Sequence, residues 1–184
     1  MIPQRVLAVC SAMASAGMVW SAVLIGGLLA GHRLVPTWLA VGAAALLTVP
    51  GVIAGVIGNR WAYRTTRPRP PWGLVSWVPP HVPHWAAMSA GVVFFGFWLA
   101  VVVAFTGLDG KAEFRDGQYV SVENGQTSVI SQADYERRVN LEQQISLGVL
   151  GALAVGATFM TGAVLTHHAA PQPTVTQSAG SPLA

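Results

Sequence analysis

The amino-acid sequence predicts an all-α membrane protein in which four transmembrane helices carry a small β-hairpin and a protruding helix between spans 3 and 4. Three observations predict this fold class. Hydrophobic residues make up 53% of the chain and charged residues only 9%, whereas a soluble domain carries about a quarter charged residues. Four long apolar blocks contain no charged residue. Every acidic residue lies in one polar segment, between Asp109 and Glu142.

The apolar blocks define the expected spans, at about residues 6–30, 38–58, 85–107 and 145–166. Each supplies at least about 20 residues, which at about 1.5 Å per residue cross a hydrocarbon core of about 30 Å. The first run is too long for the apolar region of a signal peptide, so a retained span is expected. With the polar module at 109–144, the spans form a single domain over residues 1–168. The tail, 169–184, is rich in Pro, Ser, Thr and Gln and is predicted to be disordered.

The basic residues suggest an orientation. An even number of spans places both termini and the 60–84 loop on one side of the membrane, and the polar module on the other. Four arginines without acidic neighbours follow the second span: Arg60, Arg64, Arg67 and Arg69. As many basic residues lie in the polar module, but in a segment that is predicted to fold: Lys111, Arg115, Arg137 and Arg138. The unpaired arginines favour cytoplasmic N- and C-termini. Nine arginines against one lysine are typical of GC-rich bacterial genomes, so a bacterial plasma membrane is expected.

Small residues at intervals of four in three spans would allow helices to approach closely. They are Gly27 and Gly31, Gly51 and Gly55, and Gly148, Ala152 and Gly156. Two interpretations are open, namely packing within one bundle or a seam for a second copy or a partner. Pro50 removes a backbone hydrogen bond and predicts a kink in the second span.

The polar segment contains a predicted β-hairpin. Residues 118–123 and 126–130 alternate with period two, and Asn124-Gly125 between them favours a type I′ turn. This register pairs Val120 with Val129, Val122 with Thr127, and Tyr119 with Ile130. One face of the hairpin would then be apolar. Because an isolated hairpin is marginal in water, this face must lie on the following helix, the membrane surface or a partner protein.

A helix is predicted to follow the hairpin at once. Ser131 and Asp134 have the spacing of a capping box, and Ile130 and Tyr135 that of a hydrophobic staple. Arg138 lies four residues from both Asp134 and Glu142, a spacing at which opposite charges support a helix. No helix-breaking residue precedes the fourth span, so one long helix is expected. Its first three turns or so would project about 20 Å beyond the hydrocarbon.

The segment from Phe114 to Gly148 resembles one found in small, uncharacterised bacterial (actinobacterial-like) four-span integral membrane proteins. There, an aspartate-glycine and a tyrosine precede a strand, a glycine turn, a second strand and a Ser-x-x-x-Tyr helix that enters the last span. The matching residues are Asp116, Gly117, Tyr119, Gly125, Ser131 and Tyr135. The resemblance implies a shared fold element and no known activity.

Composition and residue placement argue against several function classes. The net charge is +3 and the arginines are scattered, so the continuous basic face of a nucleic-acid-binding protein is missing. No Asp, Glu, Lys, Arg or His lies inside any span, which argues against a pump or an ion-coupled transporter. Every acid lies on the opposite side from every histidine except His32, so no Ser-His-Asp set is expected. Neither a catalytic residue nor a cofactor is predicted.

Two interpretations are open for the histidines outside the spans, and two for the arginines of the 60–84 loop. A zinc or copper site could be built from residues on one side of the membrane: His81, His84, His167, His168 and Cys10. These histidines would equally suit an interfacial loop and a helix C-terminus. The proline-rich loop could dock a partner, but it also suits anionic lipid headgroups. The residues expected at headgroups are Arg60, Arg64, Arg67, Arg69, Trp72 and Trp77.

Charge-free spans and one folded polar module together predict a non-enzymatic accessory or scaffolding subunit of a larger plasma-membrane assembly. Its partners would be the lipid bilayer and a membrane protein or a second copy of the chain. The expected interaction surface comprises Tyr119, Val120, Val122, Val129 and Tyr135. The alternative function is a small oligomeric channel or carrier for neutral or apolar molecules.

Overall fold

The computed structural model describes residues 2–66, 82–123 and 126–169, with the backbone alone at 61–66 and 167–169. Four helices and three strands are described: α1 (Gln4–Leu29), α2 (Thr37–Thr66), α3 (His84–Thr106), β1 (Lys111–Arg115), β2 (Gln118–Glu123), β3 (Gln126–Val129) and α4 (Gln132–Ala169). Among these residues, four helices are long and apolar enough to cross a membrane: Gln4–Leu29, Thr37–Arg60, His84–Thr106 and Gln132–Thr166. The helical part of the predicted fold is therefore confirmed. The polar segment differs, because it forms three strands where two were predicted.

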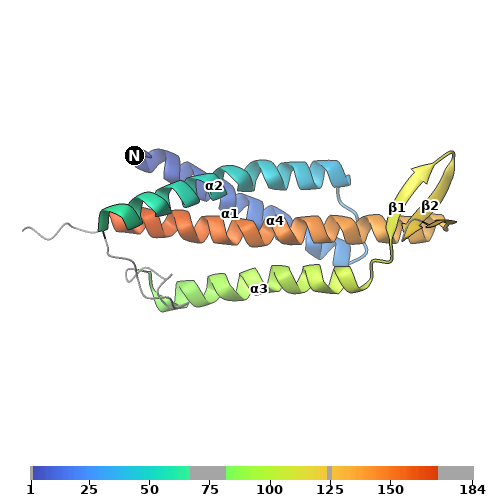
Figure 1. Cartoon of the computed structure of the whole chain (residues 1–184). Helices are drawn as coiled ribbons and strands as arrows, with labels where there is room; N and C mark the ends of the chain where they lie inside the picture. Colours follow the sequence, from blue (N-terminus) through green and yellow to red (C-terminus); the bar gives the residue numbers. More distant parts are fainter. Residues whose placement is uncertain (1, 67–81, 124–125, 170–184) are drawn as a thin grey trace, which may run out of the picture.

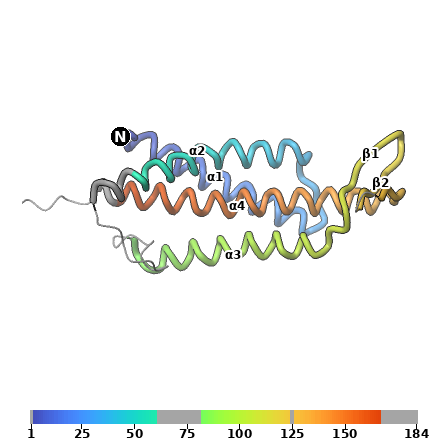
Figure 2. The backbone as a smooth tube through the Cα atoms, in the orientation of Figure 1, coloured from blue at the N-terminus to red at the C-terminus, as the bar shows by residue number. Residues whose placement is uncertain are grey.

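Helix α4 is the axis of the molecule. It runs along the whole bundle, with α2 on one side and α3 on the other, while α1 crosses behind it (Figure 1). The chain path in Figure 2 shows the N-terminus and the start of α3 at the end of the bundle opposite the sheet, and Figure 1 shows that α2 ends there as well. This arrangement agrees with the even number of spans expected from the sequence.

The residues that bound each helix explain where it begins and ends. Gly31 adopts a left-handed conformation (φ +78°), and the His32 N–H donates to the Gly27 carbonyl at 2.8 Å. Together they close α1 with the glycine cap common at helix C-termini. Pro36 and Pro83 precede α2 and α3, where a missing N–H costs nothing. Helix α2 continues through Pro50 and changes direction along its course (Figure 1), as expected for an internal proline.

Small residues bring the helices into close contact within the bundle. A Cβ atom added at Gly51 would lie 2.8 Å from the Ala14 Cβ atom of α1 and 3.4 Å from the Ala157 Cβ atom of α4. At Gly148 it would lie 2.5 Å from Val101 of α3. Packing inside one bundle therefore accounts for these two glycines. Gly156 differs, because an added Cβ atom would meet no atom within 4 Å.

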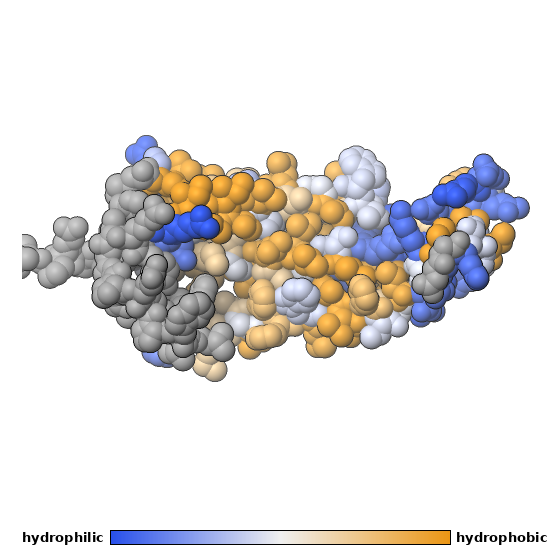
Figure 3. All heavy atoms as spheres, viewed as in Figure 1, coloured by the Kyte–Doolittle hydropathy of each residue, from blue (hydrophilic) through white to orange (hydrophobic). Residues whose placement is uncertain are grey.

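The core lies mainly between α1, α2 and α4. Its largest cluster of buried residues also takes Phe97 from α3. Helix α3 makes its contacts chiefly with α4 and leaves most of its apolar surface exposed. Figure 3 shows apolar residues over the middle of the bundle and hydrophilic residues gathered at the sheet.

Candidate functional site at the sheet end of the bundle

The sheet has three antiparallel strands in the order β1-β2-β3. Val120 pairs with Val129 and Val122 with Thr127, and the Ile130 N–H donates to the Tyr119 carbonyl at 2.9 Å. These three pairings confirm the register predicted from the sequence. The turn residues Asn124 and Gly125 lie outside the described residues.

Strand β1 was missed by the sequence analysis. It pairs with β2 so that Arg115 faces Gln118, which leaves Asp116 and Gly117 as a two-residue turn. Both turn residues have positive φ, +53° and +79°, as a type I′ turn requires. The Asp-Gly pair was a hairpin signal in its own right, and Lys111–Arg115 has the length of the strand that it should have indicated.

The start of α4 is capped as predicted. The Asp134 N–H donates to Ser131 Oγ at 3.1 Å, which satisfies one of the free donors of the first turn. The Ser131 hydroxyl in turn donates to the Asp134 carboxylate at 2.7 Å. Because this cap directly follows β3, the sheet and α4 are joined by a short, ordered connection.

One face of the sheet lies on α4. The Tyr119 ring of β2 packs against Tyr135 of α4, with 4.9 Å between the ring centroids. Beside this contact, the Arg138 Nη1 atom donates to Ser121 Oγ at 2.6 Å, and Ser121 is only 3% exposed. The expected ion pairs of Arg138 with Asp134 and Glu142 do not occur among the described residues, because its guanidinium turns to the serine of the sheet.

The five residues of the predicted interaction surface do not share one face. Side chains alternate along a strand, so Tyr119 lies on the α4 face while Val120 and Val122 lie on the outer face. Val120 is buried (6% exposed), at the centre of the outer face between its cross-strand neighbours, whereas Val129 is 69% exposed. The sequence analysis did not single out Phe114, which is 60% exposed and packs its ring against Tyr119 at 5.1 Å between centroids.

Helices α1 and α3 end, and α2 begins, beside one short stretch of α4. Thr37, the first residue of α2, donates to Gln143 Oε1 at 3.1 Å and accepts from the Arg33 guanidinium at 2.7 Å. The Gln144 amide donates to the Ala100 carbonyl of α3 at 3.1 Å. A Cβ atom at Gly107, which follows α3, would lie 3.4 Å from Leu141. Only residues 132–140 of α4, about 14 Å of helix, therefore extend past its neighbours.

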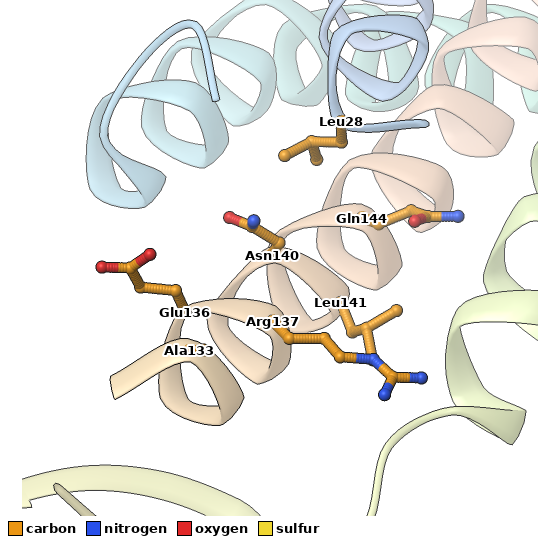
Figure 4. Close-up of a pocket in the computed structure, with 7 residues that line it drawn as sticks. All are labelled: Leu28, Ala133, Glu136, Arg137, Asn140, Leu141 and Gln144. Carbon is orange, nitrogen blue, oxygen red and sulfur yellow. The ribbon is translucent and has the colours of Figure 1, made fainter. Parts of the chain in front are cut away.

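A pocket of about 370 Å³ opens at this level. Six of its lining residues are Leu28 of α1 and Glu136, Arg137, Asn140, Leu141 and Gln144 of α4. In Figure 4, Glu136 and Asn140 extend to one side of α4 and Arg137 to the other, below Leu28. The Asn140 Oδ1 atom is buried and has no hydrogen-bond partner among the described residues. The pocket therefore combines both signs of charge with an unsatisfied acceptor.

Of the five candidate metal ligands, the structure describes the side chains of only two. Cys10 is half-buried in α1 and His84 is the first residue of α3. His81 lies outside the described residues, and the side chains of His167 and His168 are not described. Within the described part of the chain, no three His, Cys, Asp or Glu residues cluster as a metal site would need.

The predicted headgroup residues are described only in part. Arg60 is exposed on α2, and Arg64 is described by its backbone alone. Arg67, Arg69, Trp72 and Trp77 lie outside the described residues, as does the predicted disordered tail from residue 170.

Comparison with protein-family models, with curated proteins and with solved structures found no match to this chain.

Proposed function

We propose that this chain is a multi-pass protein of the bacterial plasma membrane that acts as a non-enzymatic accessory or scaffolding subunit. The partner docks on the sheet, by adding a strand to the free edge of β3. The observation that carries this proposal is the exposure of every residue of β3 on a sheet that is held firmly to α4. The N- and C-termini lie on the cytoplasmic side and the sheet on the other.

The lengths of the helices and the positions of two tryptophans support the membrane placement. Four helices are each long and apolar enough to span a bilayer. Trp38 is exposed in the first turn of α2, at the sheet end, and Trp85 in the first turn of α3, at the opposite end. Tryptophan prefers the headgroup layers, so these two positions support a membrane with one surface near each end of the bundle.

The hydrogen-bond register of β3 indicates how a partner strand would attach. Because Ile130 bonds to Tyr119 of β2, the alternation of an antiparallel ladder turns the backbone groups of Thr127 and Val129 away from β2. These groups can accept one more antiparallel or parallel strand, a common mode of peptide recognition. The exposed Val129 side chain offers such a strand an apolar contact.

Proline substitution tests the docking edge. Val129→Pro removes an N–H that points outward, so the sheet should persist while partner capture falls. Ser128→Pro removes an N–H that pairs with β2 and should disrupt the sheet itself. Capture is measured by photo-crosslinking from position 127 in native membranes, with the exposed Val19 of α1 as the control position. Undiminished crosslinking of the same protein by the Val129→Pro variant would reject edge docking, and absence of any protein crosslink would reject the accessory role.

A second candidate function is a small oligomeric channel or carrier for neutral or apolar molecules. It is favoured by the one-sided packing of α3, whose outer face repeats large apolar residues at heptad spacing. The exposed stripe consists of Trp85, Met88, Val92, Phe95, Leu99 and Val102. Such spacing suits a helix-helix seam between copies. The particle mass in mild detergent separates the two functions, because a single chain contradicts the oligomeric pore, and solute flux in liposomes would support it.

A further inference from the structure

The pocket beside residues 136–144 of α4 lies where a lipid headgroup would be. Helix α2 begins and α3 ends at this level, as the contacts of Thr37 with Gln143 and of Gly107 with Leu141 indicate, and Leu28 near the end of α1 lines the pocket as well. If the four helices span the bilayer, as proposed above, the ends of the apolar helices mark the boundary between hydrocarbon and headgroups. The Leu28 and Leu141 side chains line the pocket and give it an apolar wall next to its polar groups.

One side of the pocket can hold an anion. Arg137 forms neither an ion pair nor a side-chain hydrogen bond among the described residues, since the ion pairs there join Glu113 to Lys111 and Arg115. Its guanidinium is exposed and lines the pocket. A guanidinium fork matches the oxygen atoms of a phosphate and binds them through two parallel hydrogen bonds.

The other side of the pocket can accept hydrogen bonds from an ammonium group. Glu136 and Asn140, one helical turn apart, extend together away from Arg137 (Figure 4). Glu136 accepts one hydrogen bond, from Gln132 Nε2 at 2.9 Å, and a carboxylate can accept several more. The buried Asn140 Oδ1 atom has no donor among the described residues. A buried acceptor without a donor is unfavourable, and a small turn of the Asn140 amide into the pocket would let a ligand N–H satisfy it.

From this arrangement we infer that the pocket binds a phosphoethanolamine headgroup, with the phosphate on Arg137 and the ammonium on Glu136 and Asn140. The source is a membrane phospholipid, because Leu28 and Leu141 adjoin the place where acyl chains would begin. A volume of about 370 Å³ is at the small end of ligand pockets and suits a headgroup better than a whole lipid. A choline headgroup has no N–H donor and a phosphatidylglycerol headgroup has no cation, so lipids with either headgroup should bind less well.

Lipid retention measured by native mass spectrometry tests this inference. The full-length protein is reconstituted in nanodiscs of equal parts phosphatidylethanolamine and phosphatidylcholine, then released and weighed. We expect about tenfold preferential retention of the ethanolamine lipid, the ratio that one charge-assisted hydrogen bond supports. Glu136→Gln and Asn140→Leu should reduce the preference to near unity. Arg137→Gln should weaken retention of both lipids.

Control variants separate an effect at the pocket from a general effect of charge and from loss of the fold. Glu123→Gln and Arg115→Gln change exposed residues of the sheet and should leave lipid retention unchanged. Circular dichroism in nanodiscs of phosphatidylcholine alone reports the fold of each variant, and Asn140→Asp, which keeps an acceptor, should preserve the preference. Equal retention of both lipids by the native protein would overturn the inference. So would displacement of the bound lipid by millimolar soluble phosphoethanolamine, which would assign the pocket to a water-soluble ester. Failure to enter nanodiscs at all would instead reject the membrane placement on which the inference rests.

Discussion

The guanidinium of Arg138 donates a 2.6 Å hydrogen bond to the buried hydroxyl of Ser121, seventeen positions earlier in the chain. With the Tyr119–Tyr135 ring contact, it holds the sheet on the part of α4 that extends past the other helices. A three-stranded sheet has little core of its own and depends on such packing for its stability. The orientation of the proposed docking edge therefore depends on one arginine and one pair of rings.

Replacing Arg138 with methionine should loosen the sheet without unfolding the bundle. The substitution leaves the buried Ser121 hydroxyl without its partner, which we expect to cost about 1–3 kcal/mol. Hydrogen exchange of the β2 amides should accelerate by about tenfold or more, while α1 and α2 keep their protection. Arg137→Met is the matched control, since Arg137 forms no hydrogen bond or ion pair with the sheet among the described residues. Unchanged β2 protection in Arg138→Met would contradict this role.

Adding a methyl group at Gly148 should displace α3 from α4. The new Cβ atom would lie 2.5 Å from Val101 Cγ2 and 3.2 Å from the Phe97 carbonyl oxygen, so one helix must move. Overpacking of this kind costs about 1–3 kcal/mol. Gly156→Ala is the control, because its Cβ atom would meet nothing within 4 Å and alanine favours the helix by about 1 kcal/mol. In detergent, the midpoint of thermal unfolding should be highest for Gly156→Ala, lower for the native protein and lowest for Gly148→Ala. A midpoint of Gly148→Ala at or above that of Gly156→Ala counts against this packing.

The cap of α4 should be measurable in the same assay. Ser131→Ala removes the hydroxyl that accepts from the Asp134 N–H, and should destabilise the start of α4 by about 1 kcal/mol. Ser131→Asp restores an acceptor at this position and should recover most of the loss. Exchange of the Asp134 amide reports the cap directly. Equal exchange in the alanine variant and the native protein would show that the cap contributes nothing.

The Glu113 carboxylate should titrate below its ordinary value. The pKa of Glu113 is lowered from 4.5, first by the hydrogen bond from Lys111 and then by the charges of Lys111 and Arg115. Because this pKa is lower in the folded state, its contribution to stability is present above the ordinary value and is lost as the pH falls through the folded-state pKa. The contribution is small, since the carboxylate is partly exposed to solvent and its two cationic partners are exposed.

Lys111→Met should raise the pKa of Glu113 back towards 4.5, whereas Lys111→Arg should keep it low. The side-chain carbon shift of Glu113, followed by NMR from pH 6 to pH 2 (roughly two units either side of an ordinary glutamate), measures the midpoint. A midpoint that is the same in Lys111→Met and in the native protein would contradict the assigned cause.

The parts of the fold that depend on residues close together in the sequence could be predicted from it. Span length follows from an uninterrupted apolar run, and the pairing of β2 with β3 follows from two alternating segments around one turn. The cap of Ser131 needs only four consecutive residues. Strand β1 was equally local, signalled by Asp116 and Gly117, and was missed although its turn residues were noted.

The candidate sites, in contrast, were decided by tertiary structure. Arg138 is equally spaced from Asp134 and Glu142 in the sequence, yet it bonds to Ser121 because the sheet folds back over that face of α4. The pocket exists because α1 and α3 end and α2 begins beside residues 140–144 of α4. The positions of the helices in the sequence do not predict that these ends lie at one level. Apolar length and local pairing are properties of a segment, whereas the register between helices is set by which small residues, such as Gly51 and Gly148, let them approach.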